Sequence, residues 1–247
     1  MILPSRQDAI HKAWLYRLLT AIVDEPRLAV VLAFKGGTAA AMLGWLDRFS
    51  IDLDFDYIGD KKDMTTTREL LEKVFRDLGL EIKDASKQVP QYFLRYPTAA
   101  EHMRNTIKVD VTFPPPQANA YETFRLIDID RMVRCQTAET MFANKLVAVL
   151  DRFAKHHSIA GRDIYDIHAF YLKGCTYNEK VILERRSIAT AGPFFQELIT
   201  FIEKEITTQV LQEDLNMLLP PEVFKKCEKI LKPEVLQFLR GEIEGTL

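Results

Sequence analysis

Apolar residues along this chain follow two different periods, and the change between them divides the sequence. In the first part, short segments that are apolar or alternate between apolar and polar residues are typical of β-strands. We expect strands at residues 30–34, 51–56, 80–83, 91–96, 106–113 and 121–127. Apolar residues three or four positions apart predict helices in the same part at residues 5–23 and 68–78.

The helical period continues through nearly all of the remaining sequence. We expect helices at residues 137–153, 178–188, 193–207, 221–231 and 233–243, and a further helix that begins near Gly161. Pro114, Pro115 and Pro116 cannot lie in the middle of a sheet, so the sheet should end or break there. The pattern predicts an α+β chain with two domains, a sheet with flanking helices in residues 1–134 and an all-helical domain in residues 135–247.

Composition excludes several classes of protein. With 47% hydrophobic and 28% charged residues among 247, the chain has the make-up of a globular protein. The formal net charge of -2 means that a nucleic-acid partner would have to be bound by a local basic patch. No apolar run approaches the roughly 18 residues of a membrane span, and the N-terminus does not resemble a leader, so we expect an unanchored cytoplasmic protein without a membrane partner.

Cysteine and histidine usage points the same way. The three cysteines lie far apart, form no C-x-x-C motif and suit a reducing compartment. The five histidines include no HExxH motif, so the sequence does not predict a zinc site.

One stretch carries a pattern that suggests chemistry. The apolar segment 30–34 ends at Lys35, Gly36, Gly37 and Thr38, and good helix formers follow. Two residues without a Cβ allow a phosphate to approach the backbone, and the start of the following helix offers free N–H groups to an anion. This turn is therefore a candidate phosphate site.

Acidic residues follow the turn. Asp52, Asp54 and Asp56 alternate with Ile51, Leu53 and Phe55, so that in a strand the acids share one face. Aligned carboxylates repel one another unless a cation lies between them, and Mg²⁺ prefers carboxylate oxygen and binds together with substrate phosphates. A polar edge strand whose acids face water, with a purely local Gly-Gly turn, is the alternative. The combination favours a metal and phosphate site, in which two ions could align an in-line displacement on phosphorus.

The residues GGT followed by RFSxDLDF resemble the N-terminal signature of the nucleotidyltransferase superfamily, which has the DNA polymerase β-like fold, in its AbiEii/AbiGii toxin version. The resemblance implies a mixed sheet and places Gly36, Gly37 and Thr38, with the adjoining Lys35, in the triphosphate-binding turn. Asp52 and Asp54 match the metal-binding pair of the family. Arg48 and Ser50 match the residues that precede this pair. Asp56 receives no role from the resemblance.

A third acid lies in the segment TIKVDVTF, where Asp110 shares a strand face with Lys108 and Thr112. A single acid in such a strand often only faces solvent. The resemblance implies a third carboxylate from a neighbouring strand, and we expect Asp110 to bind the metal and accept the proton of the attacking hydroxyl.

Two helical segments carry the other candidates. Lys145 lies at the margin of the apolar stripe of the helix at 137–153, where a lysine is commonly only a surface residue. Asp163 and Asp166 lie in a helix whose start and i, i+4 spacing would also explain them. The resemblance implies that Lys145 reaches the nucleotide phosphates and that Asp163 and Asp166 orient it or the nucleotide.

We therefore expect a Mg²⁺-dependent nucleotidyltransferase that moves an NMP from an NTP to an acceptor hydroxyl. The resemblance further implies the toxin of an abortive-infection or toxin-antitoxin pair, with the 3′ end of tRNA as acceptor and a cognate antitoxin as partner. Two alternatives remain open, the same chemistry on a small molecule or protein, and a non-catalytic RNA- or protein-binding module on this fold.

Overall fold

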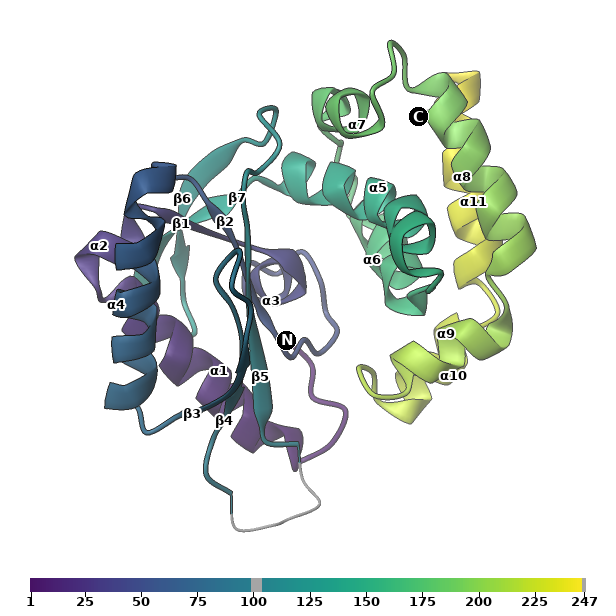
Figure 1. Cartoon of the computed structure of the whole chain (residues 1–247). Coiled ribbons are helices and arrows are strands. Elements are labelled where there is room, and N and C mark those ends of the chain that lie inside the picture. The colour runs from purple at the N-terminus through teal and green to yellow at the C-terminus, as the bar shows by residue number, and fades with distance from the viewer. Residues whose placement is uncertain (99–103, 246–247) are drawn as a thin grey trace. The chain divides into compact units, whose positions relative to one another are not determined.

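The computed structural model describes residues 1–98 and 104–245, and the chain forms two compact units (Figure 1). The first unit comprises Met1, Leu3–Pro115 and Ala120–Thr137. The second comprises Ile2, Pro116–Asn119 and Ala138–Leu247.

A seven-stranded sheet organises the first unit, in the order β3-β4-β5-β2-β1-β7-β6. Its strands are β1 (Leu32–Lys35), β2 (Leu53–Tyr57), β3 (Glu81–Ala85), β4 (Gln91–Arg95), β5 (Thr106–Thr112), β6 (Tyr121–Leu126) and β7 (Arg131–Gln136). The pairs β2/β5 and β1/β7 are parallel, and the other neighbours are antiparallel. The sheet is therefore mixed, and the predicted fold class is confirmed.

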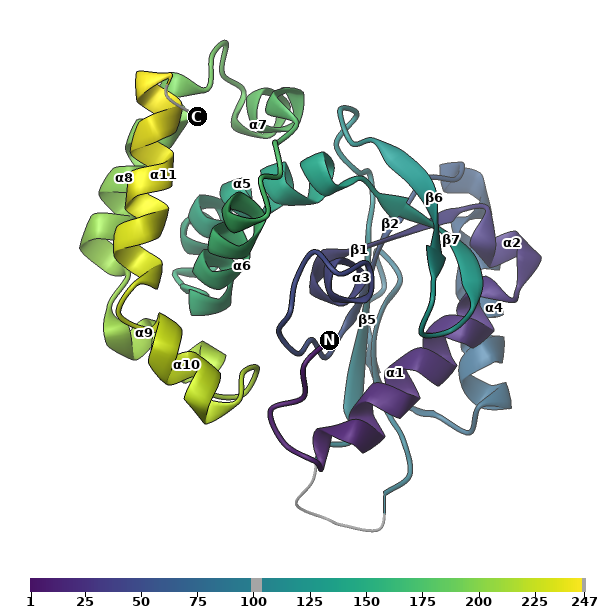
Figure 2. The same ribbon diagram turned by 180° about the vertical axis from the view of Figure 1, so that it is seen from behind.

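The helices of this unit pack against the sheet. They are α1 (Asp8–Val23), α2 (Pro26–Ala29), α3 (Gly36–Met42) and α4 (Met64–Asp77), with the short 3-10 helix η1 (Lys61–Asp63) before α4. Figures 1 and 2 show α1, α2 and α4 grouped together. Phe75 of α4 meets Tyr92 of β4 edge to face, with ring centroids 5.1 Å apart. Buried residues on this face alternate along β4 and β5 with more exposed residues on the opposite face.

Two strands begin two residues later than the sequence predicts. The first begins at Leu32 rather than at residue 30, because the short helix α2 comes before it; Pro26 lies in the first turn of α2, and Glu25 accepts a hydrogen bond from the Arg27 N–H. Strand β2 begins at Leu53, so Asp52 lies just before the strand and not within it.

The prolines interrupt the succession of strands between β5 and β6, as one of the two expectations had it, but they do not end the sheet. After Pro116 the chain returns to the opposite end of the sheet, where β6 pairs with β7 and β7 pairs with β1. Strand β7 was not predicted, and it extends through Arg134, the predicted domain boundary, to Gln136. Its sequence RMVRCQ includes three polar or charged residues, and three of its six residues are exposed.

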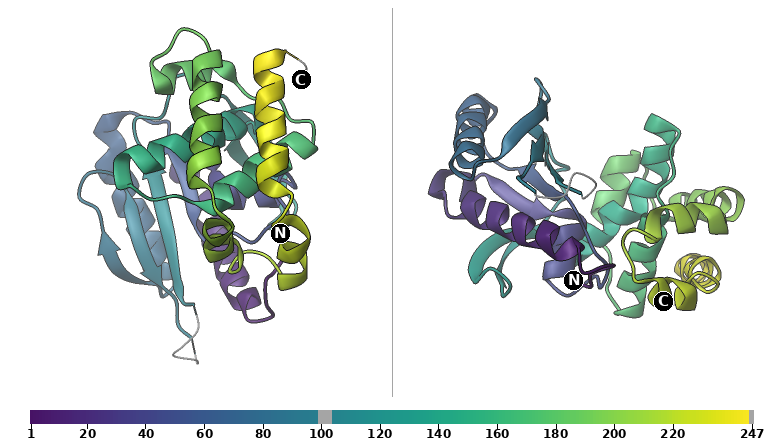
Figure 3. Two further views of the ribbon diagram at one scale, coloured as in Figure 1. Left: turned by 90° about the vertical axis from the view of Figure 1, so that its right-hand side faces the viewer. Right: turned by 90° about the horizontal axis from the view of Figure 1, so that it is seen from below.

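Helices alone form the regular structure of the second unit within its described residues. They are α5 (Ala138–His156), α6 (Gly161–Leu172), α7 (Glu179–Arg186), α8 (Gly192–Glu205), α9 (Thr208–Leu215), α10 (Pro221–Cys227) and α11 (Leu231–Glu244). Phe142 of α5 stacks on Phe170 of α6 at 5.1 Å, and α8 and α11 lie side by side (Figure 3). Helix α9 was not predicted; its cap is Thr207, which accepts a hydrogen bond from the Val210 N–H.

Candidate active site

Two acids lie next to each other on the polar face of the sheet. Asp54 of β2 and Asp110 of β5 are register partners on adjacent parallel strands, and both side chains are half-buried. Neighbouring strands are about 4.8 Å apart, so the two carboxylates extend from the sheet side by side. Their strand neighbours Leu53, Phe55 and Val109 fill the opposite, buried face. The structure thus brings together two of the three acids predicted to bind metal.

Asp52 reaches this region from the segment before β2. The hydroxyl of Thr38 donates to the Asp52 carbonyl at 2.5 Å, and Thr38 itself is fully buried. The predicted triphosphate ligand Thr38 thereby fixes the backbone of the acidic segment to the first turn of α3. Among the residues that the structure describes, no group of three or more His, Cys, Asp or Glu side chains is arranged to hold a metal ion. The metal site of Asp52, Asp54 and Asp110 stays a prediction.

The Gly-Gly turn packs directly against these acids. Gly36 has a φ of +77°, and a Cβ built on it would lie 2.3 Å from Asp54 Oδ2. A Cβ on Gly37 would lie 2.9 Å from both Arg48 Nη2 and Ser50 Oγ. Arg48 and Ser50 are buried, and the Arg48 Nη1 donates to the Phe49 carbonyl at 2.8 Å. The predicted site residues Asp54, Arg48 and Ser50 are therefore close neighbours of the turn.

Replacing Gly36 with Ala should lower activity more than stability. The new methyl group must displace the Asp54 carboxylate, while the left-handed backbone adds strain of roughly 1–2 kcal/mol. We expect nucleotide transfer to fall at least roughly 10-fold in the Gly36→Ala chain, since misplacing a catalytic group by about 1 Å costs about that much or more.

Gly44→Ala is the matched control for this prediction. Gly44 also has a φ of +77°, but a Cβ there meets nothing within 4 Å among the described residues. Both variants should lose similar stability in thermal unfolding, and only Gly36→Ala should lose transfer. Equal activity of the two variants would show that Gly36 does not position Asp54.

Two neighbours of Asp110 were not predicted. The ammonium of Lys108, two residues earlier on β5, contacts Asp110 Oδ2, and the side-chain amide of Gln91 donates to Asp110 Oδ1 at 3.2 Å. Lys108 shares the strand face of Asp110, so the alternation of β5 carried a signal for this contact. The pairing of Gln91 with Asp110 depends on the register of β4 against β5, which the local sequence does not show.

A buried ion pair lies beside the two acids. Asp56 is fully buried, and its carboxylate accepts from the Lys35 ammonium at 2.7 Å, the Tyr121 hydroxyl at 2.9 Å and the Gln136 amide at 2.6 Å. Lys35 also donates to the hydroxyl of Thr112 at 2.6 Å. Lys35, predicted to bind the nucleotide, is thus bound to Asp56, and no local pattern predicts the contacts of Asp56 with Tyr121 and Gln136.

His11 of α1 supports the acidic segment from the other side. Its Nε2 donates to the Ile51 carbonyl at 2.9 Å, its Nδ1 lies 3.0 Å from the Tyr96 hydroxyl, and the residue is 1% exposed. Burial lowers the pKa of His11 to about 4, although its bond to Ile51 acts in the opposite direction. The bond from His11 to the Ile51 carbonyl and the bond from Thr38 to the Asp52 carbonyl occupy backbone groups that would pair with a neighbouring strand if β2 were longer. This explains why β2 begins only at Leu53.

This histidine should make the fold acid-sensitive. The unfolded chain binds a proton at His11 below about pH 6.5, whereas the folded chain resists protonation until about pH 4, so stability is full above pH 6.5 and falls as the pH drops towards 4. The shift corresponds to about 3 kcal/mol at most. In His11→Asn, the stability measured by urea unfolding from pH 7 to pH 4 should fall less steeply than in the native chain. Parallel curves for the two chains would contradict this role.

In the second unit, the predicted residues of α5 and α6 form one charged cluster. The Lys145 ammonium lies 2.7 Å from Asp166 Oδ2 and 3.3 Å from Asp163 Oδ1. Asp163 also binds Arg152, whose Nη2 lies 3.3 Å from Asp163 Oδ2. Both acids are at most 1% exposed, so the lysine is held in a fixed direction by buried carboxylates. Arg152 was not predicted, although it follows Lys145 by seven residues on the same helix face.

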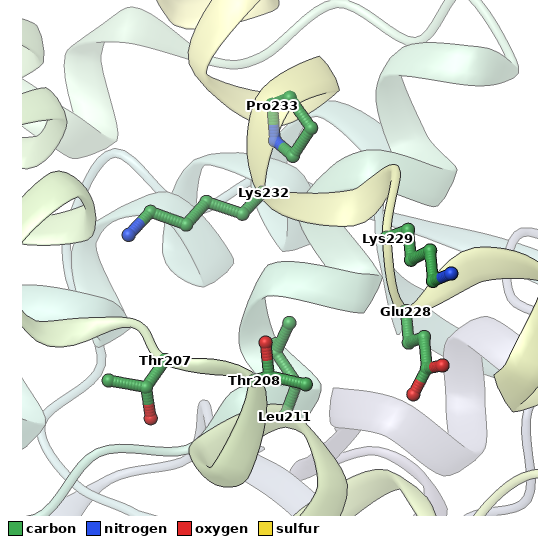
Figure 4. Close-up of a pocket in the computed structure, with 7 residues that line it drawn as sticks. All are labelled: Thr207, Thr208, Leu211, Glu228, Lys229, Lys232 and Pro233. Atoms are coloured by element: carbon green, nitrogen blue, oxygen red, sulfur yellow. The ribbon is translucent and has the colours of Figure 1, made fainter.

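A pocket of about 340 Å³ also lies in this unit, lined by residues of α9, of α11 and of the segments just before these two helices (Figure 4). Its lining consists of Thr207, Thr208, Leu211, Glu228, Lys229, Lys232 and Pro233. Lys232 is committed to the end of α8, because its ammonium donates to the carbonyls of Glu203 and Ile206 at 2.9 and 2.8 Å. The pocket includes none of the predicted site residues.

Solved structures define the class of this fold. JHP933 from Helicobacter pylori is 20% identical, with a TM-score of 0.59 over 99% of this chain and 96% of that chain. MenT4, a nucleotidyltransferase toxin from Mycobacterium tuberculosis H37Rv, is 18% identical, with a TM-score of 0.55 over 95% and 84%. An antigenic nucleotidyltransferase-like protein from Paracoccidioides brasiliensis is 17% identical, with a TM-score of 0.51 over 90% and 97%. The fold is that of a nucleotidyltransferase.

The family follows from the sequence. Residues 17–227 match the model of the nucleotidyl transferase AbiEii toxin family of type IV toxin-antitoxin systems, and the chain belongs to this family. It is a nucleotidyltransferase family enzyme, so its substrate is an NTP and an antitoxin is its counterpart in the system. No curated protein sequence matches the chain. None of the described helices has the length and apolar character needed to cross a membrane.

Proposed function

We propose that this chain is a Mg²⁺-dependent nucleotidyltransferase that moves an NMP from an NTP to a hydroxyl at the 3′ end of tRNA. The observation that carries the proposal is the pair of half-buried carboxylates, Asp54 and Asp110, which lie in register on parallel strands against a glycine turn. Like charges opposite each other on neighbouring strands destabilise a sheet, although Lys108 offsets part of the charge on Asp110, and carboxylate pairs are typical ligands of divalent cations.

The residues fit magnesium. Carboxylate oxygens are the ligands that Mg²⁺ prefers, and Asp54 and Asp110 remain partly accessible, so that waters and substrate phosphate could complete the coordination. We assign Asp52, at the entrance to β2, as the third ligand. Bound magnesium, as two ions, would supply charge that stabilises the attacking and leaving oxygens.

The residues of the first unit account for each step of the proposed transfer. The acceptor oxygen forms a bond to the α-phosphorus of the NTP, the bond from that phosphorus to the β-phosphate oxygen breaks, and pyrophosphate leaves. Asp110 accepts the proton of the acceptor hydroxyl directly or through water. Gly36 and Gly37 let the triphosphate approach the backbone, and Thr38, Arg48 and Ser50 keep this turn and the acids in place.

We propose a supporting role for the charged cluster of the second unit. Lys145 would bind the phosphates of the NTP, since a compact ammonium offsets charge on the leaving pyrophosphate. Asp163 and Asp166 would orient Lys145, and their contacts at 3.3 and 2.7 Å support this part of the proposal. The substrates NTP and tRNA are cytoplasmic, so the proposal places the reaction in the cytoplasm.

Labelled transfer tests the proposal. Purified protein is incubated with Mg²⁺, total tRNA and each of the four α-labelled NTPs in turn, and the RNA is separated from protein and small molecules. We expect label in RNA with at least one NTP, and its loss when EDTA is added. Label on protein or on a small molecule, and not on RNA, would show that the enzyme uses another acceptor. If no molecule of a cell extract becomes labelled and NTP does not raise the unfolding temperature, the result would favour the alternative of a non-catalytic binding module.

A further inference from the structure

Strands β4 and β5 present one uncovered face next to the acid pair. On the covered face, Tyr92, Leu94, Ile107 and Val109 are buried. The alternate residues of β4 on the uncovered face are Gln91, Phe93 and Arg95, and those of β5 are Thr106, Lys108 and Asp110. Phe93 is the apolar exception on this polar face, and it is 37% exposed.

A single exposed phenylalanine is common on protein surfaces and proves nothing by its exposure. Its place in the sheet is informative. Phe93 is the register partner of Lys108, and the next pair of the ladder on the same face is Gln91 with Asp110. Phe93 and Asp110 are therefore diagonal neighbours on this face. Such neighbours lie about 7–8 Å apart, which is comparable with the distance from a nucleotide base to the hydroxyls of its own ribose.

Lys108 connects the aromatic ring with the acid. Its ammonium contacts Asp110 Oδ2 and lies 6.0 Å from the centroid of the Phe93 ring. The face therefore combines an exposed ring, a partly exposed cation and the acid assigned as proton acceptor. Proteins that bind single-stranded RNA combine aromatic rings on which bases stack with cations that bind the backbone.

The strand order indicates which substrate this face would take. In the order β4-β5-β2-β1, the acids lie on the two central strands, Phe93 lies on β4, and the glycine turn follows β1 at the other side. If the triphosphate of the NTP binds at the glycine turn, the side of the acid pair that faces β4 remains for the acceptor. This face of β4 and β5 is therefore placed to bind the acceptor, whose hydroxyl attacks, and not the NTP, whose nucleotide is transferred.

We propose that Phe93 stacks on the terminal base of the acceptor RNA and, together with Lys108, places the terminal ribose hydroxyl at Asp110. This inference rests on the proposed transfer to RNA and adds to it a binding site for the acceptor. Phe93 is a positioning residue, because it binds the base and does not touch the reacting atoms.

Kinetics with two substrates test the inference. In Phe93→Ala we expect the KM for tRNA to rise roughly 5- to 100-fold, the range that follows from losing one base stack, while the KM for NTP changes less than about 2-fold. Phe93→Trp should restore the native KM for tRNA, because tryptophan also offers a stacking surface. If the KM for NTP rises instead, Phe93 stacks on the base of the nucleotide and the assignment to the acceptor is wrong.

Ile82→Ala is the matched control. Ile82 is also 37% exposed and lies on the neighbouring strand β3, but its register partner is the buried Leu94, so it belongs to the opposite face. We expect its KM for tRNA to be native. An equal increase in both variants would indicate a general loss of structure and overturn the inference.

A binding measurement separates this inference from the proposed reaction. The anisotropy of a short fluorescein-labelled single-stranded RNA with a free 3′ hydroxyl is titrated with protein, without NTP or magnesium. The native chain should bind it, and Phe93→Ala should bind it roughly 5- to 100-fold more weakly, whether or not transfer occurs. No binding by the native chain, or equal binding by both chains, would overturn the acceptor site and leave the transferase chemistry untouched.

Discussion

Asp54→Asn is expected to slow nucleotide transfer roughly 1000-fold and to leave the unfolding temperature within a few degrees of the native value. Asparagine has nearly the same shape as aspartate but carries no charge, so the proposed magnesium ligand is lost. Asp54 and Asp110 are neighbours in register and both are acidic, so removing one charge relieves repulsion and offsets the loss of other contacts. A large loss of activity without a large loss of stability is the signature of a functional acid.

The measurement is single-turnover transfer with saturating NTP and tRNA, beside a thermal unfolding curve for each chain. Asp77→Asn is the control, because Asp77 is an exposed acid of the same unit that pairs with Lys73 on the surface of α4 at 2.9 Å. It should retain native transfer. Native activity in Asp54→Asn would remove the central support for the proposed chemistry.

Local sequence was sufficient to predict the residues whose roles follow from spacing along the chain. Alternation places Asp54 and Asp110 on the face opposite to Phe55 and Val109 whichever strands lie beside them. The pair Gly36 and Gly37 marks a turn because no other residue tolerates a positive φ or a close approach so readily. The helical period likewise predicted both elements that carry Lys145, Asp163 and Asp166.

Contacts that depend on strand order could not be predicted in this way. Asp56 looked like a third member of the acidic row, yet its partners come from β1, β6 and β7, which lie far from it in the sequence. Strand β7 itself was missed because its sequence does not alternate clearly; its pairing with β1 and β6 makes it a strand. Tertiary pairing outweighed local preference here, as is common for strands.

The two acids of β2 therefore differ in role although they differ by only two positions. Asp54 is half-buried beside another carboxylate, whereas Asp56 is fully buried beside the Lys35 ammonium. A carboxylate that is neutralised inside the protein contributes to structure, and one that faces a second acid at the surface is suited to bind a cation. The same alternation thus produced a structural acid and a candidate functional acid.

Lys35→Met should destabilise the chain by about 3 kcal/mol, because breaking a buried ion pair leaves a charge without its counterion in the interior. Lys35 is 20% exposed at its side chain while Asp56 is not exposed, so methionine can fill the space of the lysine stem but cannot neutralise the carboxylate. For a unit of this size, the unfolding temperature should fall by roughly 10 °C. Thermal unfolding at neutral pH measures this loss.

A second substitution distinguishes a structural lysine from a nucleotide-binding one. In Lys35→Met combined with Asp56→Asn, the buried charge is gone, and the amide oxygen can still accept from Tyr121 and Gln136, so most of the lost stability should return. The double variant should also bind NTP as the native chain does, because the lysine is committed to Asp56 and Thr112. If stability returns but the KM for NTP rises roughly 10-fold or more, Lys35 contacts the phosphates, as the family resemblance implies.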